Sequence, residues 1–326
     1  MKQNVLNETI EYRNYKESDY ESYSTFCENN FGKKNYQRNS SYLKWLYEDT
    51  INSFSVAVNN NTITGIIHKF KAPIEINGQF IKVTVLHDLM VDSKYRSGAG
   101  LHLMQSGLYS DEYVVLPGSV GRLSRAYGRL GSKPFNSFWY KKFQMPKGLY
   151  SLNKVKSLNR YKSLAKNQGL TFGHNKENNK DFHENALKKY INIECCLDYF
   201  KWRFFHKNAP LTFYVSDESR ENTVLFVIGK RGFLPYVRIF YVSSENEVIL
   251  GEIVQFIETI TAKIGISVVL FTTFEASPPK RLMYRQYKEI PISYVFSKNK
   301  NHDFIPNVPT FCSDIGFDGI NPFENI

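Results

Sequence analysis

The feature that most constrains this chain is an internal repeat with an offset of 157 residues. The tetrapeptide Tyr-Leu-Lys-Trp at positions 42–45 matches Tyr-Phe-Lys-Trp at positions 199–202. Near the other end of the same unit, Tyr127 matches Tyr284 at the same offset. A shared offset at both ends of a unit indicates a duplicated fold. The sequence therefore predicts two copies of one domain, and we expect Trp45 and Trp202 to anchor the core of each copy.

Both copies show the same predicted order of elements: a hairpin, a long strand, a helix, a buried strand and a short helix. In the first copy these begin at residues 54, 80, 101, 113 and 123. Strands are indicated by alternating or continuous apolar runs, and helices by a period near 3.6. We therefore expect an α/β (α+β) fold of two tandem domains, each a mixed, largely antiparallel sheet flanked by helices.

The predicted division follows composition. Residues 1–145 form the first domain, and residues 191–326 form the second domain with a C-terminal tail. Residues 146–190 are rich in Lys and Asn and have weak periodicity, which is typical of a connector.

Composition also limits which cellular compartment and which binding partners are expected. The chain has 326 residues, 42% of them hydrophobic, and a formal charge of +11. Its four cysteines show no metal-ligand spacing, which favours a reducing compartment and no metal. We expect a cytoplasmic protein without membrane insertion, because no signal peptide or long apolar run is evident. Solvated lysines explain most of the charge, so the charge does not by itself indicate nucleic acid.

A candidate ligand site lies within residues 83–108. An apolar strand is followed by a basic, glycine-rich turn and then by a helical pattern. Such a turn aims backbone N–H groups and a helix N-terminus at one point, which suits a phosphate or pyrophosphate. The equivalent loop of the second copy, between Tyr241 and Val248, is acidic and lacks glycine. We therefore expect a ligand in the first copy only.

These residues resemble the Gcn5-related N-acetyltransferase (GNAT) superfamily over residues 8–144. The family hallmark is a strand, an Arg-x-x-Gly-x-Gly/Ala turn and a helix. Here the strand is Leu89-Met90-Val91 and the turn is Arg96-Ser97-Gly98-Ala99-Gly100, one residue shorter than the family pattern. The family's Tyr-x-x-x-Gly-Phe element is similar to residues 127–132, where Ser132 replaces the phenylalanine.

The resemblance implies that acyl-CoA is the co-substrate. It assigns the binding of acyl-CoA to the strand, the turn and the first helical residue, namely Leu89, Met90, Val91, Arg96, Ser97, Gly98, Ala99, Gly100 and Leu101. The strand would offer an N–H to the developing oxyanion if it splays from the strand at 113–116. By the same resemblance, Tyr127 is the acid that protonates the leaving thiolate.

Two further catalytic candidates precede the turn. Strict alternation along a strand places His87 on the face of Val85 and Leu89, and Asp88 on the opposite face. A carboxylate on that face needs a partner or a role, so Asp88 is predicted to be the base or the ligand of the acceptor amine. His87 is either a second candidate for the base or a packed histidine.

Tandem GNAT folds of this length resemble two groups of enzymes. One comprises sugar N-acyltransferases of bacterial surface-polysaccharide pathways, including O-antigen and lipopolysaccharide, and the other FemABX-type aminoacyl-tRNA-dependent transferases. We expect the first activity, in which an acetyl or longer hydroxyacyl group moves to the amine of a nucleotide-linked (for example dTDP-linked) amino sugar. The acceptor's diphosphate would meet basic residues near the cleft, namely Arg122, Arg125, Lys201 or Arg203. The FemABX-type activity and a non-catalytic binding module remain alternatives, and a homodimer is left open.

Overall fold

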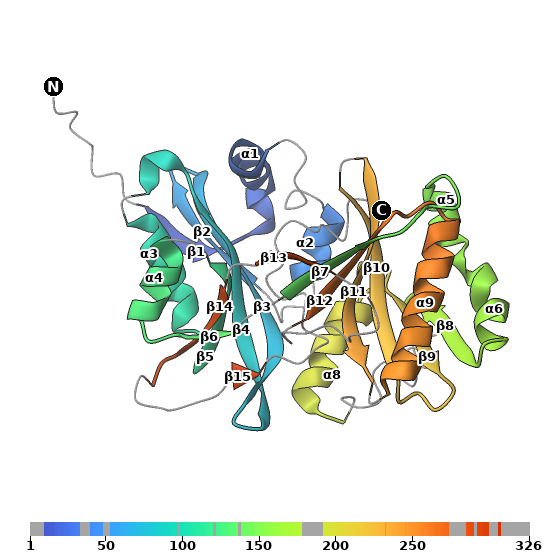
Figure 1. The fold of residues 1–326 in the computed structure, drawn as a ribbon. Coiled ribbons are helices and arrows are strands. Elements are labelled where there is room, and N and C mark those ends of the chain that lie inside the picture. Colours follow the sequence, from blue (N-terminus) through green and yellow to red (C-terminus); the bar gives the residue numbers. More distant parts are fainter. Residues whose placement is uncertain are drawn as a thin grey trace.

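Two sheets stand side by side in the structure (Figure 1), which is a computed structural model. It describes residues 10–32, 40–47, 53–96, 98–119, 122–135, 138–177, 192–231, 233–244, 246–273, 285–289, 292–299 and 306–307. Helices α3 and α4 lie on the outer side of the first sheet, and α6 and α9 on the outer side of the second. Helices α2 and α8 lie between the sheets.

The first sheet runs in the order β1-β2-β3-β4-β5-β14-β6, with β15 paired to β3. Strands β4 and β5 are parallel, and the other registered neighbours are antiparallel. The β3–β4 hairpin turns at Asn77 and Gly78, both with positive φ (50° and 81°), as that dipeptide predicts. The strands are β1 (Glu11–Asn14), β2 (Ser53–Asn59), β3 (Thr62–Ile76), β4 (Gln79–Val91), β5 (Tyr113–Ser119), β6 (Lys133–Phe135), β14 (Ile292–Ser297) and β15 (Pro306–Asn307).

Four α-helices accompany this sheet among the described residues. They are α1 (Tyr20–Phe31), α2 (Ser40–Tyr47), α3 (Ala99–Leu108) and α4 (Arg122–Arg129), with short 3-10 turns at Glu17–Asp19 and Ser93–Tyr95. Helix α3 begins at Ala99, two residues before the predicted start. It packs closely on β4 at Gly107, where a Cβ atom would lie 2.5 Å from a methyl carbon of Leu86.

The second sheet runs in the order β13-β7-β12-β11-β10-β9-β8. Its strands are β7 (Phe138–Phe143), β8 (Leu170–His174), β9 (Phe213–Asp217), β10 (Thr223–Arg231), β11 (Leu234–Ser243), β12 (Val268–Thr273) and β13 (Arg285–Glu289). Its helices are α5 (Leu152–Lys156), α6 (Lys162–Lys166), α8 (Glu194–Phe200) and α9 (Glu247–Lys263), with a 3-10 turn at Leu158–Tyr161 and a π-helical turn η5 at Lys201–Phe205. Strands β11 and β12 form the parallel pair that corresponds to β4 and β5.

The two copies exchange strands. Strand β7 of the first copy lies between β12 and β13 of the second sheet, and β14 of the second copy lies between β5 and β6 of the first sheet. The sheets therefore do not divide at residue 145, where the composition placed the boundary. The predicted connector, residues 146–190, also contains β8, which is the edge strand of the second sheet. A boundary drawn along the sequence cannot show this exchange, because strand pairing is a tertiary contact.

Trp45 and Trp202 pack against each other rather than in separate cores. Their rings are stacked, with centroids 5.0 Å apart and planes 8° apart. Each indole N–H donates to the backbone carbonyl of the other tryptophan, at 3.1 Å and 2.8 Å. Both belong to one buried apolar cluster that includes residues of both copies. The repeated tryptophans thus form the seam between the copies.

This seam predicts coupled stability of the two copies. Trp45→Leu and Trp202→Leu should each lower the free energy of unfolding by about 3 kcal/mol, because each removes a buried ring. The double variant should lose less than the sum, with a coupling of roughly 0.5–3 kcal/mol, because the rings contact each other. Denaturant unfolding followed by circular dichroism would measure this. Phe256→Leu, in the separate core under α9, is the control, and its loss of unfolding free energy should add to that of Trp45→Leu. If the losses of the two tryptophan variants also added, the prediction would be contradicted.

Candidate active site

The two parallel strands of the first sheet separate at the predicted ligand site. The registered pairs between β4 and β5 are Thr84 with Val114 and Val85 with Val115. Residues 86–91 of β4 continue along β3 on their other side, so their edge toward β5 is open. The Asp92 N–H donates to the Thr64 carbonyl at 2.8 Å, so the preceding Val91 directs its own N–H and C=O toward the open edge. The separation of the two strands that an oxyanion donor on β4 would require is therefore present.

The turn after β4 presents an uncapped helix N-terminus. Gly98 has φ of 109°, which an L-residue rarely adopts, and no side chain caps the first turn of α3. The first N–H groups of α3, from Ala99 to Leu101, therefore point out along the helix axis. The Arg96 side chain is exposed, and its Nε donates to the Val91 carbonyl at 3.4 Å. Ser97 lies outside the described residues.

The corresponding helix of the second copy is already capped. The Asn246 side chain accepts from the N–H groups of Val248 and Ile249, at 2.9 Å and 3.3 Å. Glu247 adds a negative charge to the first turn. The parallel strands β11 and β12 pair over four positions, from Tyr236 to Ile239. The second copy thus differs from the first at its helix N-terminus, which is capped by a side chain.

Tyr127 lies on the same face of the first sheet as the turn. It is 7% exposed and belongs to a buried cluster with Val91 and Ala99, against which Leu89 also packs. Its ring is edge-on to Tyr294 of β14, with centroids 5.8 Å apart. The structure therefore brings Tyr127 together with the end of β4 and the start of α3. Tyr294 escaped sequence reasoning because it reaches this face through the exchanged strand.

A β-bulge changes the faces of the next candidates. Met90 is opposite Ile66 and His87 is opposite His68, so β4 has one more residue than β3 in this interval. Asp88 has φ of 51° within the bulge. Asp88 consequently lies on the face of His87, and the alternation that placed it on the opposite face was wrong. Beyond the bulge Leu89 and Val91 face Tyr127, so the expectation that Leu89 shares a face with His87 was wrong too.

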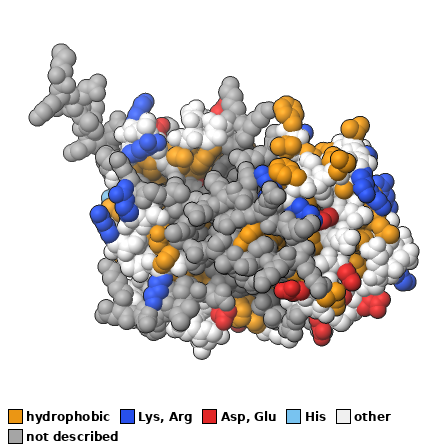
Figure 2. Space-filling model, in the orientation of Figure 1, with side chains coloured by type: hydrophobic (Ala, Val, Ile, Leu, Met, Phe, Trp, Pro, Cys, Tyr) orange, Lys and Arg blue, Asp and Glu red, His pale blue; other side chains and the backbone are white. Residues whose placement is uncertain are grey.

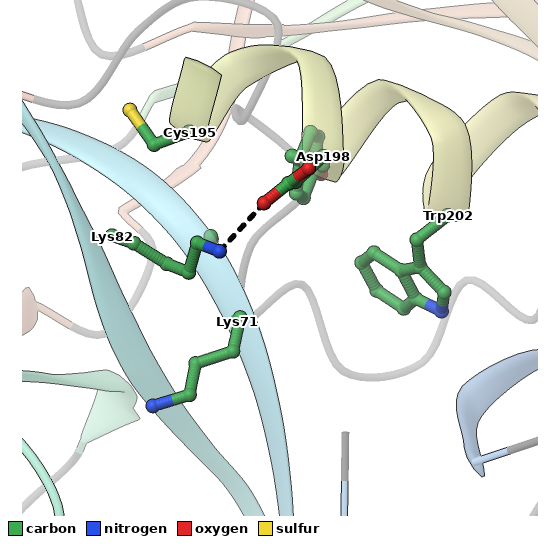
Figure 3. A pocket seen from close by; sticks show the side chains of 7 residues that line it. Lys71, Lys82, Cys195, Asp198 and Trp202 are labelled. Carbon is green, nitrogen blue, oxygen red and sulfur yellow. Dashed lines mark hydrogen bonds and ion pairs between the residues drawn. The ribbon is translucent and has the colours of Figure 1, made fainter. Parts of the chain in front are cut away.

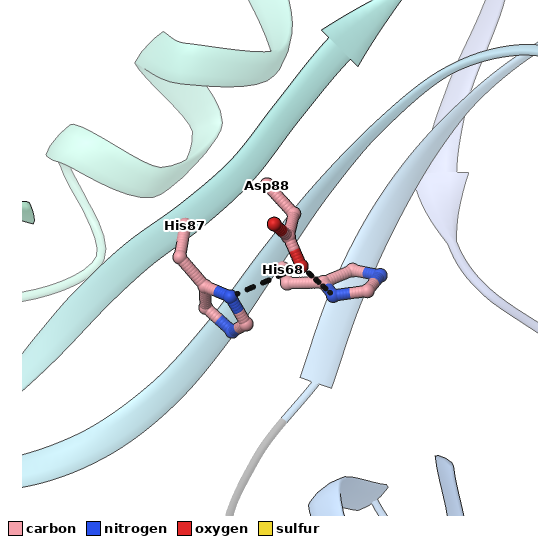
Figure 4. Close-up of side chains that lie close together, drawn as sticks. All are labelled: His68, His87 and Asp88. Atoms are coloured by element: carbon pink, nitrogen blue, oxygen red, sulfur yellow. Dashed lines mark ion pairs between the residues drawn. The ribbon is translucent and has the colours of Figure 1, made fainter. Parts of the chain in front are cut away.

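The bulge assembles a buried cluster of His68, His87 and Asp88 (Figure 4). The Asp88 Oδ2 atom lies 3.2 Å from Nδ1 of His68 and 3.3 Å from Nδ1 of His87. The three side chains are 0%, 8% and 4% exposed. On the far side of His68, its Nε2 is 3.2 Å from the hydroxyl of Tyr23 on α1. The sequence did not point to His68 or Tyr23, because only the register between β3 and β4 brings them to Asp88.

Burial and the ion pairs set the charges in this cluster. Burial alone would raise the pKa of Asp88, but the two histidines outweigh it and hold the pKa well below its ordinary value. Burial lowers the pKa of His68, and the neighbouring carboxylate opposes this only in part. An ionised Asp88 beside a neutral His68 follows. The three ligating atoms lie within 4.8 Å of one another, which is also the composition of a metal site.

A small pocket lies at the seam (Figure 3), lined by Lys71, Lys82, Cys195, Asp198, Tyr199 and Trp202 among others. Lys82 of β4 pairs with Asp198 of α8 at 2.6 Å. A hydrogen bond with Cys196 lowers the pKa of Cys195 to about 7. This pocket joins the copies but does not open onto any predicted site residue.

The basic residues proposed to bind the acceptor's diphosphate differ in how far their side chains are exposed to solvent. Lys201 and Arg125 are exposed, whereas Arg203 is 3% exposed and lies over the Trp45 ring. Arg203 is therefore a seam residue, and its assignment to a diphosphate was wrong. The Arg122 side chain lies outside the described residues. Figure 2 shows basic side chains at both ends of the visible face rather than in one stripe. No helix among the described residues is long and apolar enough to cross a membrane.

Comparison with known proteins identifies the fold. No family model matches the chain, and no curated protein matches it in sequence. A GCN5-related N-acetyltransferase from Anabaena variabilis matches with a TM-score of 0.59 and 12% identity, over 88% of this chain and 72% of that chain. A tandem GNAT protein from the clavulanic acid biosynthesis pathway matches with a TM-score of 0.54 and 9% identity, over 89% of this chain and 98% of that chain. A glucosamine N-acetyltransferase region of a fungal multi-domain β-N-acetylglucosaminidase matches with a TM-score of 0.56 and 14% identity, over 90% of this chain and 38% of that chain.

These likenesses show the fold. The chain has two tandem GNAT-like domains, each built on a mixed sheet flanked by helices. The predicted fold class is confirmed.

The cluster predicts how stability depends on pH. Because the pKa of His68 is lowered in the fold, the unfolded chain binds more protons just below its own histidine pKa of about 6.5. The melting temperature should therefore fall as pH is lowered from 7 to 5, while the Asp88 contribution is lost only at more acidic pH. His68→Gln should flatten the profile between pH 5 and 7, as measured by thermal unfolding. An equally steep profile in this variant would contradict the assignment.

Proposed function

We propose that this chain is an acyl-CoA-dependent N-acyltransferase that transfers an acetyl or longer hydroxyacyl group to the amine of a nucleotide-linked amino sugar. The single observation that carries the proposal is the open edge of β4 beside the uncapped start of α3. Tyr127 lies on one face of this opening, and His87 and Asp88 lie on the other. The opening therefore has candidate proton donors and acceptors on both sides.

Binding of the donor follows from the geometry of the turn. The pyrophosphate of acyl-CoA would accept from the N–H groups at the start of α3 and from the Arg96 guanidinium. The thioester would then enter the gap between β4 and β5. There the outward-pointing N–H of Val91 is a donor for the thioester carbonyl, and that hydrogen bond strengthens as the oxyanion develops.

The chemical step is a direct displacement. The neutral amine attacks the thioester carbonyl carbon, a C–N bond forms, and the C–S bond breaks. The amine loses one proton to the face of His87 and Asp88. The leaving thiolate takes one proton from the Tyr127 hydroxyl, which regains it from solvent. The products are an amide and free CoA. Holding both substrates in the opening would supply a large part of the rate enhancement.

The amino-sugar acceptor is supported by charge and by one structural neighbour. Exposed Lys201 and Arg125 remain available for an acceptor diphosphate. The fungal neighbour is a glucosamine N-acetyltransferase region, so this fold is used with an amino sugar in that protein. The surface-polysaccharide setting belongs to the same proposal. Salt-dependent binding of tRNA would instead favour the FemABX-type activity.

Arg96 tests the donor site. Arg96→Ala should weaken acetyl-CoA binding about 10-fold in isothermal titration calorimetry, because one charge-assisted hydrogen bond contributes roughly 1.5–3 kcal/mol. Lys166→Ala, which removes an exposed charge on α6, should leave the affinity unchanged. If acetyl-CoA did not bind, or bound equally to Arg96→Ala, the donor site would be misplaced.

Tyr127 tests the acid. Tyr127→Phe should lower kcat about 100-fold with a dTDP-linked 4-amino sugar and acetyl-CoA, because general acid catalysis contributes roughly 10²–10⁴. Acetyl-CoA affinity should not change. Thiol release measures the rate, and Tyr140→Phe, a buried tyrosine of the second sheet, is the matched control. An unchanged kcat would assign Tyr127 to packing alone.

A further inference from the structure

His87 has one ring nitrogen that its surroundings leave unsatisfied. Its Nε2 atom is buried and has no hydrogen-bond partner among the described residues. The other ring nitrogen, Nδ1, faces the Asp88 carboxylate at 3.3 Å, so Nε2 points away from the cluster (Figure 4). Buried polar atoms without a partner are uncommon and require an explanation.

The cluster determines which ring nitrogen carries the hydrogen. An ionised Asp88 only accepts hydrogen bonds, so Nδ1 of His87 donates to it. Whenever the ring is neutral, its lone pair is therefore on Nε2. In this arrangement the carboxylate selects the tautomer and orients the ring, as the carboxylate of a hydrolytic triad does.

The surroundings of His87 limit which other groups can take part. Within the part of the chain that the structure describes, the titratable groups in contact with Asp88 and His87 are His68 from β3 and, behind it, Tyr23 from α1. Phe70 is edge-on to the His87 ring, with centroids 5.2 Å apart, and Phe54 is edge-on to His68 at 4.9 Å. Neither phenylalanine carries a charge. His68 therefore holds Asp88 from the other side, and Tyr23 holds His68.

His87 also lies where a base would be needed. It is the second residue beyond the last registered pair between β4 and β5, so it flanks the opening. Its face of the sheet is opposite to that of Tyr127. An amine that approaches the thioester from this face would meet Nε2, while the thiolate leaves toward Tyr127.

We infer that Nε2 of His87 is the general base that takes the proton from the acceptor amine, with Asp88 and His68 as positioning residues. This inference rests on the proposed acyl transfer and assigns its proton acceptor. As the C–N bond forms, one amine proton moves to Nε2 and the ring becomes an imidazolium beside the Asp88 carboxylate. That proton then passes to solvent, and the C–S bond breaks as described above.

The same three residues would suit a metal ion less well. A histidine that binds a metal through Nδ1 carries hydrogen on Nε2, and that N–H is normally given an acceptor. No acceptor for Nε2 of His87 exists among the described residues. An unprotonated Nε2, by contrast, has an unshared electron pair that can accept the substrate's proton.

The inference can be tested first without any acceptor. Selective 15N-histidine labelling and long-range 15N–1H correlation of the whole chain should show His87 as the Nδ1–H tautomer near pH 7. His87→Gln assigns the signal, and Asp88→Asn should abolish the tautomer preference. An Nε2–H tautomer in the wild type would overturn the inference, as would one equivalent of a transition metal in the purified protein by elemental analysis.

Kinetics then separate the roles. With acetyl-CoA and a dTDP-linked 4-amino sugar, His87→Gln should lower kcat/KM about 100-fold and remove the ascending limb of its pH profile. His68→Gln should lower kcat/KM less than 10-fold and move the ascending limb of the pH profile to a different pH.

His174→Gln, at a half-buried histidine of the second sheet, is the control. If His87→Gln lowered kcat/KM less than threefold, the inference would be overturned. The transferase activity itself would still be supported by acetyl-CoA binding and by the loss of kcat in Tyr127→Phe. If acetyl-CoA bound but no amine were acylated, the proposed function would fail, and the inference that rests on it would fail too.

Discussion

The stacked indoles of Trp45 and Trp202 are the contact on which the remaining architecture depends. Each ring covers the other, and each N–H satisfies a carbonyl of the opposite copy. The stack continues from Trp202 to Phe70, and from Phe70 to the ring of His87. A contact between the copies is therefore linked, ring by ring, to the candidate proton acceptor.

The exchanged strands make the second copy necessary to the first. Its own helix N-terminus is capped by the Asn246 side chain, whereas no side chain caps that of the first copy. Nevertheless β14 supplies Tyr294, whose ring packs against Tyr127. The copy whose helix N-terminus is capped thus contributes a side chain that packs against Tyr127 of the other copy. Loss of the second copy would remove that contact and expose the edge of β5.

The parts of this fold that the sequence predicts are the ones that local pattern encodes. The 157-residue offset indicated the duplication, Asn77-Gly78 the hairpin, and the run from Leu89 to Gly100 the strand, turn and helix. The exchange of β7 and β14 was invisible, because a strand's pattern does not name its partner. His68 and Tyr23 were missed for the same reason. They reach Asp88 only through the register of β3 against β4 and the packing of α1.

One extra residue in β4 decides the chemistry on both faces of the sheet. Without the bulge, strict alternation would direct Asp88 into the apolar cluster of Leu86 and Tyr127, where its charge would be buried without a partner. With the bulge, Asp88 adopts a left-handed φ of 51°, a conformation that aspartate tolerates better than most residues. The carboxylate then lies between two imidazoles, whose ring nitrogens at 3.2 Å and 3.3 Å offset its burial. The same shift places Leu89 and Val91 on the face of Tyr127, so the candidate donor face and the candidate proton acceptor are both placed by a single irregularity in one strand.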